Sequence, residues 1–159
     1  MNTRPRGFTL IEVVVVLAVV AILAMIAMPN MQQKIVRDQI IEAAKLADIA
    51  KEPVGLAWKT THALPADNAA AGLPPADRIV SNWISSVAVE AGAIHLTFGN
   101  SANGAIRGKV LSFRPAVVAD APVVPVAWVC AFGPAPGNMT VMGPNRTNVE
   151  AGYLPLNCR

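Results

Sequence analysis

Hydrophobic and polar residues follow three different patterns along the 159-residue chain, and each pattern predicts a different element. Residues 8–28 are hydrophobic almost without interruption, since only Thr9 and Glu12 are polar. An α-helix of this length spans roughly 31 Å, about the thickness of the hydrocarbon core of a bilayer. We expect a helix because lipid offers backbone polar groups no other partners. Arg4 and Arg6 precede this segment and predict a cytoplasmic N-terminus.

The second pattern is amphipathic and covers residues 29–62. Its apolar positions recur at helical spacing, and charged residues lie mostly on the opposite side. The predicted buried stripe consists of Val36, Ile40, Ala43, Ala47 and Ala50. We therefore predict one long helix from Phe8 to His62. Pro29 and Pro53 lack an amide donor and are predicted to kink it.

The third pattern predicts a sheet over residues 85–132. A connecting loop rich in alanine, proline and glycine, residues 63–84, comes before it. Four strand-like runs follow, at residues 85–89, 93–98, 110–113 and 126–132. A turn at residues 90–92 favours a hairpin between the first two runs. The expected fold is α+β, a four-stranded antiparallel sheet packed on the amphipathic half of the helix.

Composition sharpens this division of the chain. The whole sequence is 53% hydrophobic and 14% charged, with a net charge of +3. Without the apolar segment, about 47% of the remaining residues are hydrophobic, an ordinary value for a globular domain. Disorder is excluded by so much apolar content with so little charge. Two of the three net charges belong to the arginines before the apolar segment, so the basic balance is weak support for nucleic-acid binding.

The start of the chain resembles the class III leader of type IV prepilins. The resemblance rests on the run Arg6-Gly7-Phe8-Thr9-Leu10-Ile11-Glu12, followed by the apolar segment and Pro29. It implies that a prepilin peptidase cuts between Gly7 and Phe8, removes leader residues 1–7 and methylates the new amine of Phe8. On a helix, Phe8 and Glu12 share one face, and Glu12 is then expected to set assembly register by pairing with such an amine. An ordinary signal peptide or signal anchor is the alternative reading.

The resemblance extends to the rest of the chain. Residues 94–99, 102–106 and 108–111 are similar to the sheet region of type IVa major pilins. Residues 128–130 and 153–159 are similar to their disulfide-bounded C-terminal region. The corresponding region here is residues 130–159. Cys130 and Cys158 are the only cysteines, both beyond the apolar segment, where an oxidising compartment preserves disulfides. The rival roles are a metal site, which needs more ligands at suitable spacing, and a nucleophilic thiol.

The remaining candidate chemistry is sparse. His62 is predicted at the helix end, and His95 lies in a strand-like run where alternation with Ile94 and Leu96 predicts a solvent-facing side chain. No phosphate loop, zinc signature or paired-carboxylate motif appears in the sequence. We therefore predict no catalytic, cofactor-binding or metal-binding residues, no cofactor and no enzyme activity.

The resulting hypothesis is a structural subunit of a type IV pilus, held in the inner membrane before it enters the extracellular filament. Its expected partners are copies of itself, the prepilin peptidase and methyltransferase, the inner-membrane assembly machinery and membrane lipid. The resemblance implies adhesion, twitching motility and DNA uptake as outputs, and leaves a surface receptor and DNA open as partners. The alternatives are a minor pilin or type II secretion pseudopilin, and a membrane-anchored periplasmic binding domain or enzyme.

Overall fold

The computed structural model describes residues 7–159, and the side chains of these residues except 28–30. It divides into two compact units, Met1–Ile35 and Val36–Arg159. The predicted leader includes residues 1–6, with Arg4 and Arg6, which lie outside the described residues.

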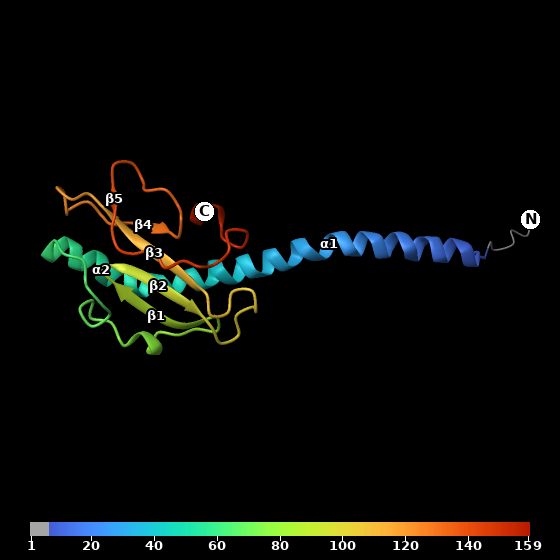
Figure 1. Cartoon of the computed structure of the whole chain (residues 1–159), viewed down its shortest axis with the longest axis horizontal. Helices are drawn as coiled ribbons and strands as arrows, with labels where there is room; N and C mark the ends of the chain where they lie inside the picture. Colours follow the sequence, from blue (N-terminus) through green and yellow to red (C-terminus); the bar gives the residue numbers. More distant parts are fainter. Residues whose placement is uncertain (1–6) are drawn as a thin grey trace, which may run out of the picture. The chain divides into compact units, whose positions relative to one another are not determined.

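The chain is helical from Leu10 to Thr61, close to the helix that the pattern predicts (Figure 1). Helix α1 covers Leu10–Ala44, a 3₁₀ turn η1 covers Lys45–Ala47, and α2 covers Asp48–Thr61. The helix ends at His62, which has a φ of 58° and whose amide donates to the Trp58 carbonyl oxygen at 3.0 Å. Pro29 lies within α1 and Pro53 within α2, and the kinks proposed at these two positions remain predictions.

The strands form one antiparallel sheet in the order β1-β2-β3-β4 (Figure 1). Their bounds are Ile84–Glu90 for β1, Ala93–Phe98 for β2, Val110–Val117 for β3 and Ala127–Cys130 for β4. A fifth strand, β5 at Thr140–Val141, was not predicted and pairs with β3. Ala116 of β3 pairs with both β4 and β5, so β5 continues the β2 edge of β3 past the end of β2.

The predicted hairpin joins β1 to β2 through Ala91 and Gly92. Both residues have positive φ, 48° and 81°, as a tight two-residue turn requires. A Cβ at Gly92 would also lie 2.9 Å from the Leu64 side chain. The turn therefore needs glycine at this position for its backbone and for the approach of the connecting loop.

The core of the Val36–Arg159 unit forms between the helix stripe and the sheet. All five predicted stripe residues are buried, and Val54 and Trp58 extend the stripe along α2. The five stripe residues and Val54 belong to one core with sheet residues such as Leu96, Phe98 and Leu111. Three of the five predicted positions are alanines, whose small side chains allow a helix to approach a sheet closely.

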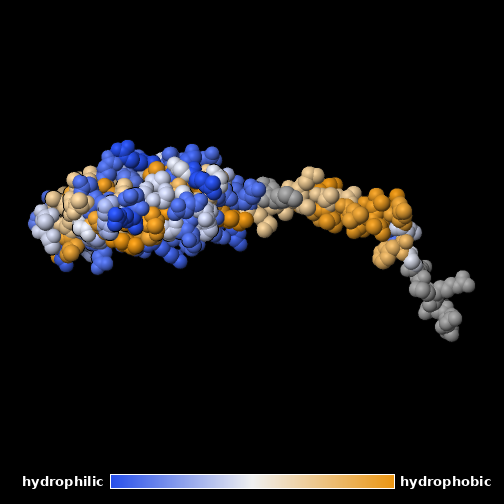
Figure 2. Space-filling view, turned by 90° about the horizontal axis from the view of Figure 1, so that it is seen from below, coloured by the Kyte–Doolittle hydropathy of each residue, from blue (hydrophilic) through white to orange (hydrophobic). Residues whose placement is uncertain are grey.

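The Met1–Ile35 unit has a different surface. Its apolar side chains from Leu10 to Ile26 are 45–83% exposed. Figure 2 shows a hydrophobic surface along this helix and a mixed, mostly polar one over the other unit. The helix contains an 18-residue window with a mean hydropathy of 3.1, long and apolar enough to cross a membrane.

Candidate functional site: the helix start and the C-terminal region

The predicted processing residues, Gly7 and Phe8, lie just before the first turn of α1. Gly7, Phe8 and Thr9 are not helical, and α1 begins at Leu10. The Glu12 amide donates to the Thr9 carbonyl oxygen at 3.1 Å and to Thr9 Oγ1 at 3.4 Å. A threonine that accepts the amide three residues later through its side chain is the N-cap of a helix, and Thr-x-x-Glu is the capping-box spacing.

This cap corrects one expectation from the sequence. Phe8 precedes the N-cap, so Phe8 and Glu12 do not lie on one helix face in this chain. The Phe8 side chain is 82% exposed, and a Cβ added at Gly7 would meet nothing within 4 Å. The peptide bond between Gly7 and Phe8 therefore lies outside α1.

The two cysteines form the predicted disulfide. Cys130 at the end of β4 and Cys158 in the 3₁₀ turn η3, Leu156–Cys158, are bonded with a Cα–Cα distance of 4.6 Å. Backbone bonds support the crossing, because the Phe132 amide donates to the Cys158 carbonyl oxygen at 3.1 Å. Gly133 lies so close that a Cβ there would be 2.6 Å from the Asn157 carbonyl oxygen. The disulfide region is thus packed tightly where it meets the sheet.

Between the cysteines, the chain returns to β3 through side-chain hydrogen bonds. Asn148 accepts the Val110 amide at 2.6 Å through Oδ1, and Thr147 Oγ1 accepts the Ser112 amide at 3.0 Å. The Asn145 side-chain amide donates to the Ala131 carbonyl oxygen at 2.9 Å. The segment 145–148 therefore follows the edge of β3 beyond the end of β4 without forming a strand, and from there Arg146 covers part of the outer face of the sheet.

This cover overturns the prediction for His95. Its alternation with Ile94 and Leu96 does place it on the outer face, yet the residue is only 5% exposed. The Arg146 amide donates to Ser112 Oγ at 2.9 Å, and the same oxygen lies 2.9 Å from His95 Nδ1. Alternation predicted which face His95 occupies, but the returning C-terminal segment decides whether that face meets water.

An ion pair completes a ring of polar groups over His95. Arg146 forms a bidentate ion pair with Glu90, and Arg146 Nη2 lies 2.6 Å from Glu90 Oε1. His95 Nε2 lies 3.4 Å from Glu90 Oε2. The donors and acceptors of these hydrogen bonds are consistent when Ser112 donates its hydroxyl proton to His95 Nδ1 and the neutral imidazole carries its proton on Nε2. We name these four residues, Glu90, His95, Ser112 and Arg146, the polar clasp.

The pKa shifts of two residues in the polar clasp, His95 and Glu90, favour this arrangement. Burial lowers the pKa of His95 below 6.5, although the nearby Glu90 carboxylate opposes that shift. The hydrogen bond from Arg146 lowers the pKa of the exposed Glu90 carboxyl. At neutral pH the clasp therefore holds a neutral imidazole under a charged ion pair.

The serine, histidine and carboxylate of the polar clasp resemble a nucleophile triad only in residue type. Ser112 is 0% exposed, and its Oγ already accepts the Arg146 amide. A catalytic serine must reach a substrate carbonyl. The arrangement instead fixes the C-terminal segment to the sheet.

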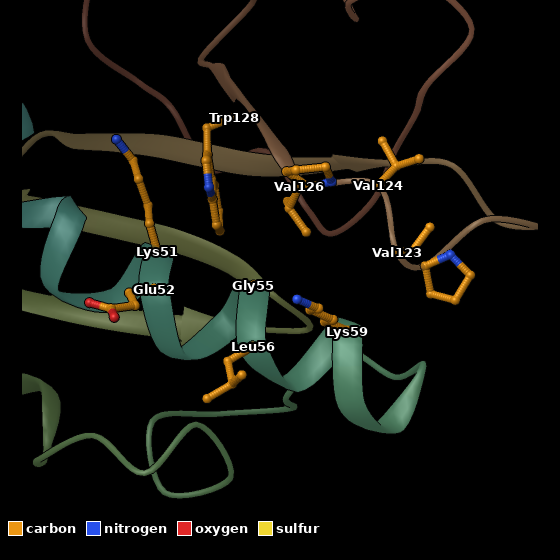
Figure 3. A pocket seen from close by; sticks show the side chains of 11 residues that line it. Lys51, Glu52, Gly55, Leu56, Lys59, Val123, Val124, Val126 and Trp128 are labelled. Carbon is orange, nitrogen blue, oxygen red and sulfur yellow. The ribbon is translucent and has the colours of Figure 1, made fainter.

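A groove of about 340 Å³ lies between α2 and the loop before β4 (Figure 3). Lys51 and Lys59 come from α2, and Val124, Val126 and Trp128 come from the opposite wall. The Lys51 amine is 2.7 Å from an Asp48 carboxylate oxygen and 4.7 Å from the centre of the Phe113 ring. These contacts hold Lys51 against the wall of the groove.

Two family descriptions match this chain, and together they cover nearly all of it. A prokaryotic N-terminal methylation motif matches residues 2–28, and the family described as pilin, a bacterial filament protein, matches residues 36–159. The first match contains the capped helix start, and the second contains the sheet and the disulfide region. The chain thus combines the sheet unit of a bacterial filament protein with an N-terminal methylation motif.

Individual relatives make the assignment more specific. The chain is 34% identical over 166 residues to the type IV major pilin protein PilE1 of Neisseria gonorrhoeae, covering 100% of this chain and 89% of the relative. It is 32% identical over 169 residues to a fimbrial protein of Neisseria meningitidis, covering 100% and 96%. It is also 34% identical over 160 residues to the fimbrial protein EcpC of Eikenella corrodens, covering 97% and 90%. The chain belongs to the type IV pilin family.

Proposed function

We propose that the chain is the major structural subunit of an extracellular type IV pilus. The observation that carries this proposal is an apolar helix whose side chains are not covered by the rest of the described chain. From Leu10 to Ile26 its large apolar side chains are 45–83% exposed. The similarity of the whole chain to proteins named as type IV major pilins supports the same proposal.

The uncovered helix would need two apolar environments in succession, first the membrane and then the filament core. Fully burying an aliphatic side chain stabilises by about 1.5–3 kcal/mol, so a run of such residues needs lipid or other apolar helices around it. Before assembly, residues 8–28 lie in the inner membrane, with the leader on the cytoplasmic side. After assembly, the same residues of many copies pack together as the filament core, and the Val36–Arg159 unit faces outward.

Processing creates the charge that assembly uses. A prepilin peptidase hydrolyses the bond between Gly7 and Phe8, and its methyltransferase activity transfers a methyl group to the new Phe8 amine. That amine is cationic near neutral pH, with a reference pKa of about 7.7–8. Because Phe8 lies before the helix, its amine is free to meet Glu12 of a neighbouring subunit. The pairing of two charges among apolar helices then selects one axial register.

The experiment is a direct test of abundance and processing. Filaments sheared from native cells are expected to consist mainly of this chain, beginning at N-methylated Phe8 by mass spectrometry. An intact leader on assembled chains would refute the processing. Glu12→Ala is expected to reduce filament yield and leave membrane insertion intact, whereas Glu12→Asp should retain part of the assembly. Normal filament yield from Glu12→Ala would refute the register role.

The same experiment distinguishes a major pilin from the alternative subunits. A minor pilin or secretion pseudopilin would be scarce in sheared filaments and would leave their yield dependent on another chain. Adhesion, twitching motility and DNA uptake are the outputs proposed for the filament. Deleting the chain should abolish each of them together with the filament.

A further inference from the structure

We infer that Thr9 is a positioning residue for the proposed cleavage, because its N-cap stops α1 before the Gly7–Phe8 bond and leaves that bond open to the peptidase. The inference rests on the proposed processing. It assigns the threonine a role in the chain as a substrate, separate from the role proposed for Glu12 in the assembled filament.

The geometry shows where the helix stops and what stops it. Thr9 accepts the Val13 amide at 3.3 Å and the Glu12 amide at 3.1 Å through its carbonyl oxygen. Its Oγ1 is a second acceptor for the Glu12 amide, at 3.4 Å. Gly7 and Phe8 lie before this cap and are not helical.

A helix continued backward by two residues would change the bond to be cut. The Phe8 carbonyl would then accept the Glu12 amide, and the Gly7 carbonyl would accept the Ile11 amide, as the i to i−4 pattern requires. The carbonyl and hydroxyl oxygens of Thr9 therefore compete together with the Phe8 carbonyl for the Glu12 amide. When Thr9 is the acceptor, the Gly7 carbonyl remains outside the helical hydrogen bonds.

That carbonyl is the group that hydrolysis attacks. Water adds its hydroxyl to the Gly7 carbonyl carbon, the carbon–nitrogen bond breaks, and the Phe8 nitrogen takes the proton. The new carboxyl group then gives its proton to the amine, so the products are the Gly7 carboxylate and the protonated Phe8 amine. If the Gly7 carbonyl were engaged in a helix, the first turn would have to unwind before attack.

In the membrane, extension of α1 toward the N-terminus competes with the cap at Thr9. Unpaired amides at a helix start are costly in an apolar environment, so lipid favours any structure that pairs them. The Thr9 hydroxyl adds a second acceptor beside the Thr9 carbonyl, which strengthens the pairing of the Glu12 amide without extending the helix. Serine and asparagine can serve as the same cap, whereas valine has the shape of threonine without the hydroxyl.

The test measures cleavage of the full-length chain by its prepilin peptidase in detergent micelles, with Thr9→Val, Thr9→Ser and Thr9→Asn. Thr9→Val is expected to lower kcat/KM by about three- to fivefold, the scale of a lost cap. The loss should fall on KM, because only the fraction of chains with an open bond binds productively. Thr9→Ser and Thr9→Asn should stay within about twofold of the wild type, since both restore the cap.

NMR of the uncleaved chain in micelles gives the second measurement. In Thr9→Val, the carbonyl shifts of Gly7 and Phe8 should move toward helical values, and in Thr9→Asn they should not. Wild-type rates or unchanged shifts in Thr9→Val would overturn the inference. So would Thr9→Asn being cut as slowly as Thr9→Val, because the peptidase would then be reading side-chain shape. A wild-type chain that is never cut refutes the processing itself, while the NMR shifts report on the cap alone.

Discussion

Removing the disulfide is expected to cost the Val36–Arg159 unit about 3.5 kcal/mol of unfolding free energy. The perturbation is the double substitution Cys130→Ala and Cys158→Ala. The two residues are 28 positions apart, and closing a loop of that length removes entropy from the unfolded chain worth about 3.5 kcal/mol near 25 °C. Typical domains have only about 5–15 kcal/mol in total, so the loss is a large share.

The assay is guanidinium denaturation of the full-length chain in mild detergent, followed by tryptophan fluorescence. The three tryptophans, Trp58, Trp83 and Trp128, all lie in the Val36–Arg159 unit, so the signal reports on that unit. Reducing the wild type with a thiol should give the same shift, and the thiol should have no effect on the double variant. A loss below about 1 kcal/mol would refute the loop-closure reasoning, since the model of unfolded-chain entropy allows no such small value at this length.

The remaining predictions use the same denaturation assay. Gly133→Ala should destabilise by about 1–3 kcal/mol, because its Cβ would lie 2.6 Å from a backbone carbonyl oxygen, whereas Gly152→Ala, with open space around it, should be nearly neutral. Between about pH 7.5 and pH 5.5 the wild type should lose stability, since burial lowers the folded pKa of His95 below 6.5 and the unfolded chain binds the proton first. His95→Gln should flatten that loss, and an equally steep pH dependence would contradict the assignment. Ile40→Ala should cost about 2–5 kcal/mol, while the exposed Ile49→Ala should cost little; equal effects would mean that the buried stripe is misplaced.

Much of the fold follows from periodicity in the sequence. The buried stripe and the four main strands have repeating patterns that a helix or a half-buried strand imposes, and the turn residues 90–92 indicate the hairpin. Strand β5 has only two residues, Thr140 and Val141, too few for alternation to be read. It forms because the C-terminal region passes the part of β3 that β2 leaves unpaired.

Two features of the candidate sites depend on contacts that periodicity does not report. His95 is buried by a segment that bonds to the sheet through Asn145, Thr147 and Asn148, and such side-chain bonds leave no repeating pattern. The cap at Thr9 does have a signal, the Thr-x-x-Glu spacing. A long apolar run favours a helix from Phe8, and the local hydrogen bond to Oγ1 decides otherwise.

The way in which the C-terminal region is attached has a consequence for engineering. Its anchors are concentrated at the disulfide, at β5 and in the segment 145–148, while residues 134–138 between them are all exposed. Exposed loop tips with few backbone constraints are the places that accept inserted sequence best. A short peptide inserted after Gly137 should therefore leave the unit folded. In a filament of many copies, that peptide would be displayed at a regular spacing along the whole surface.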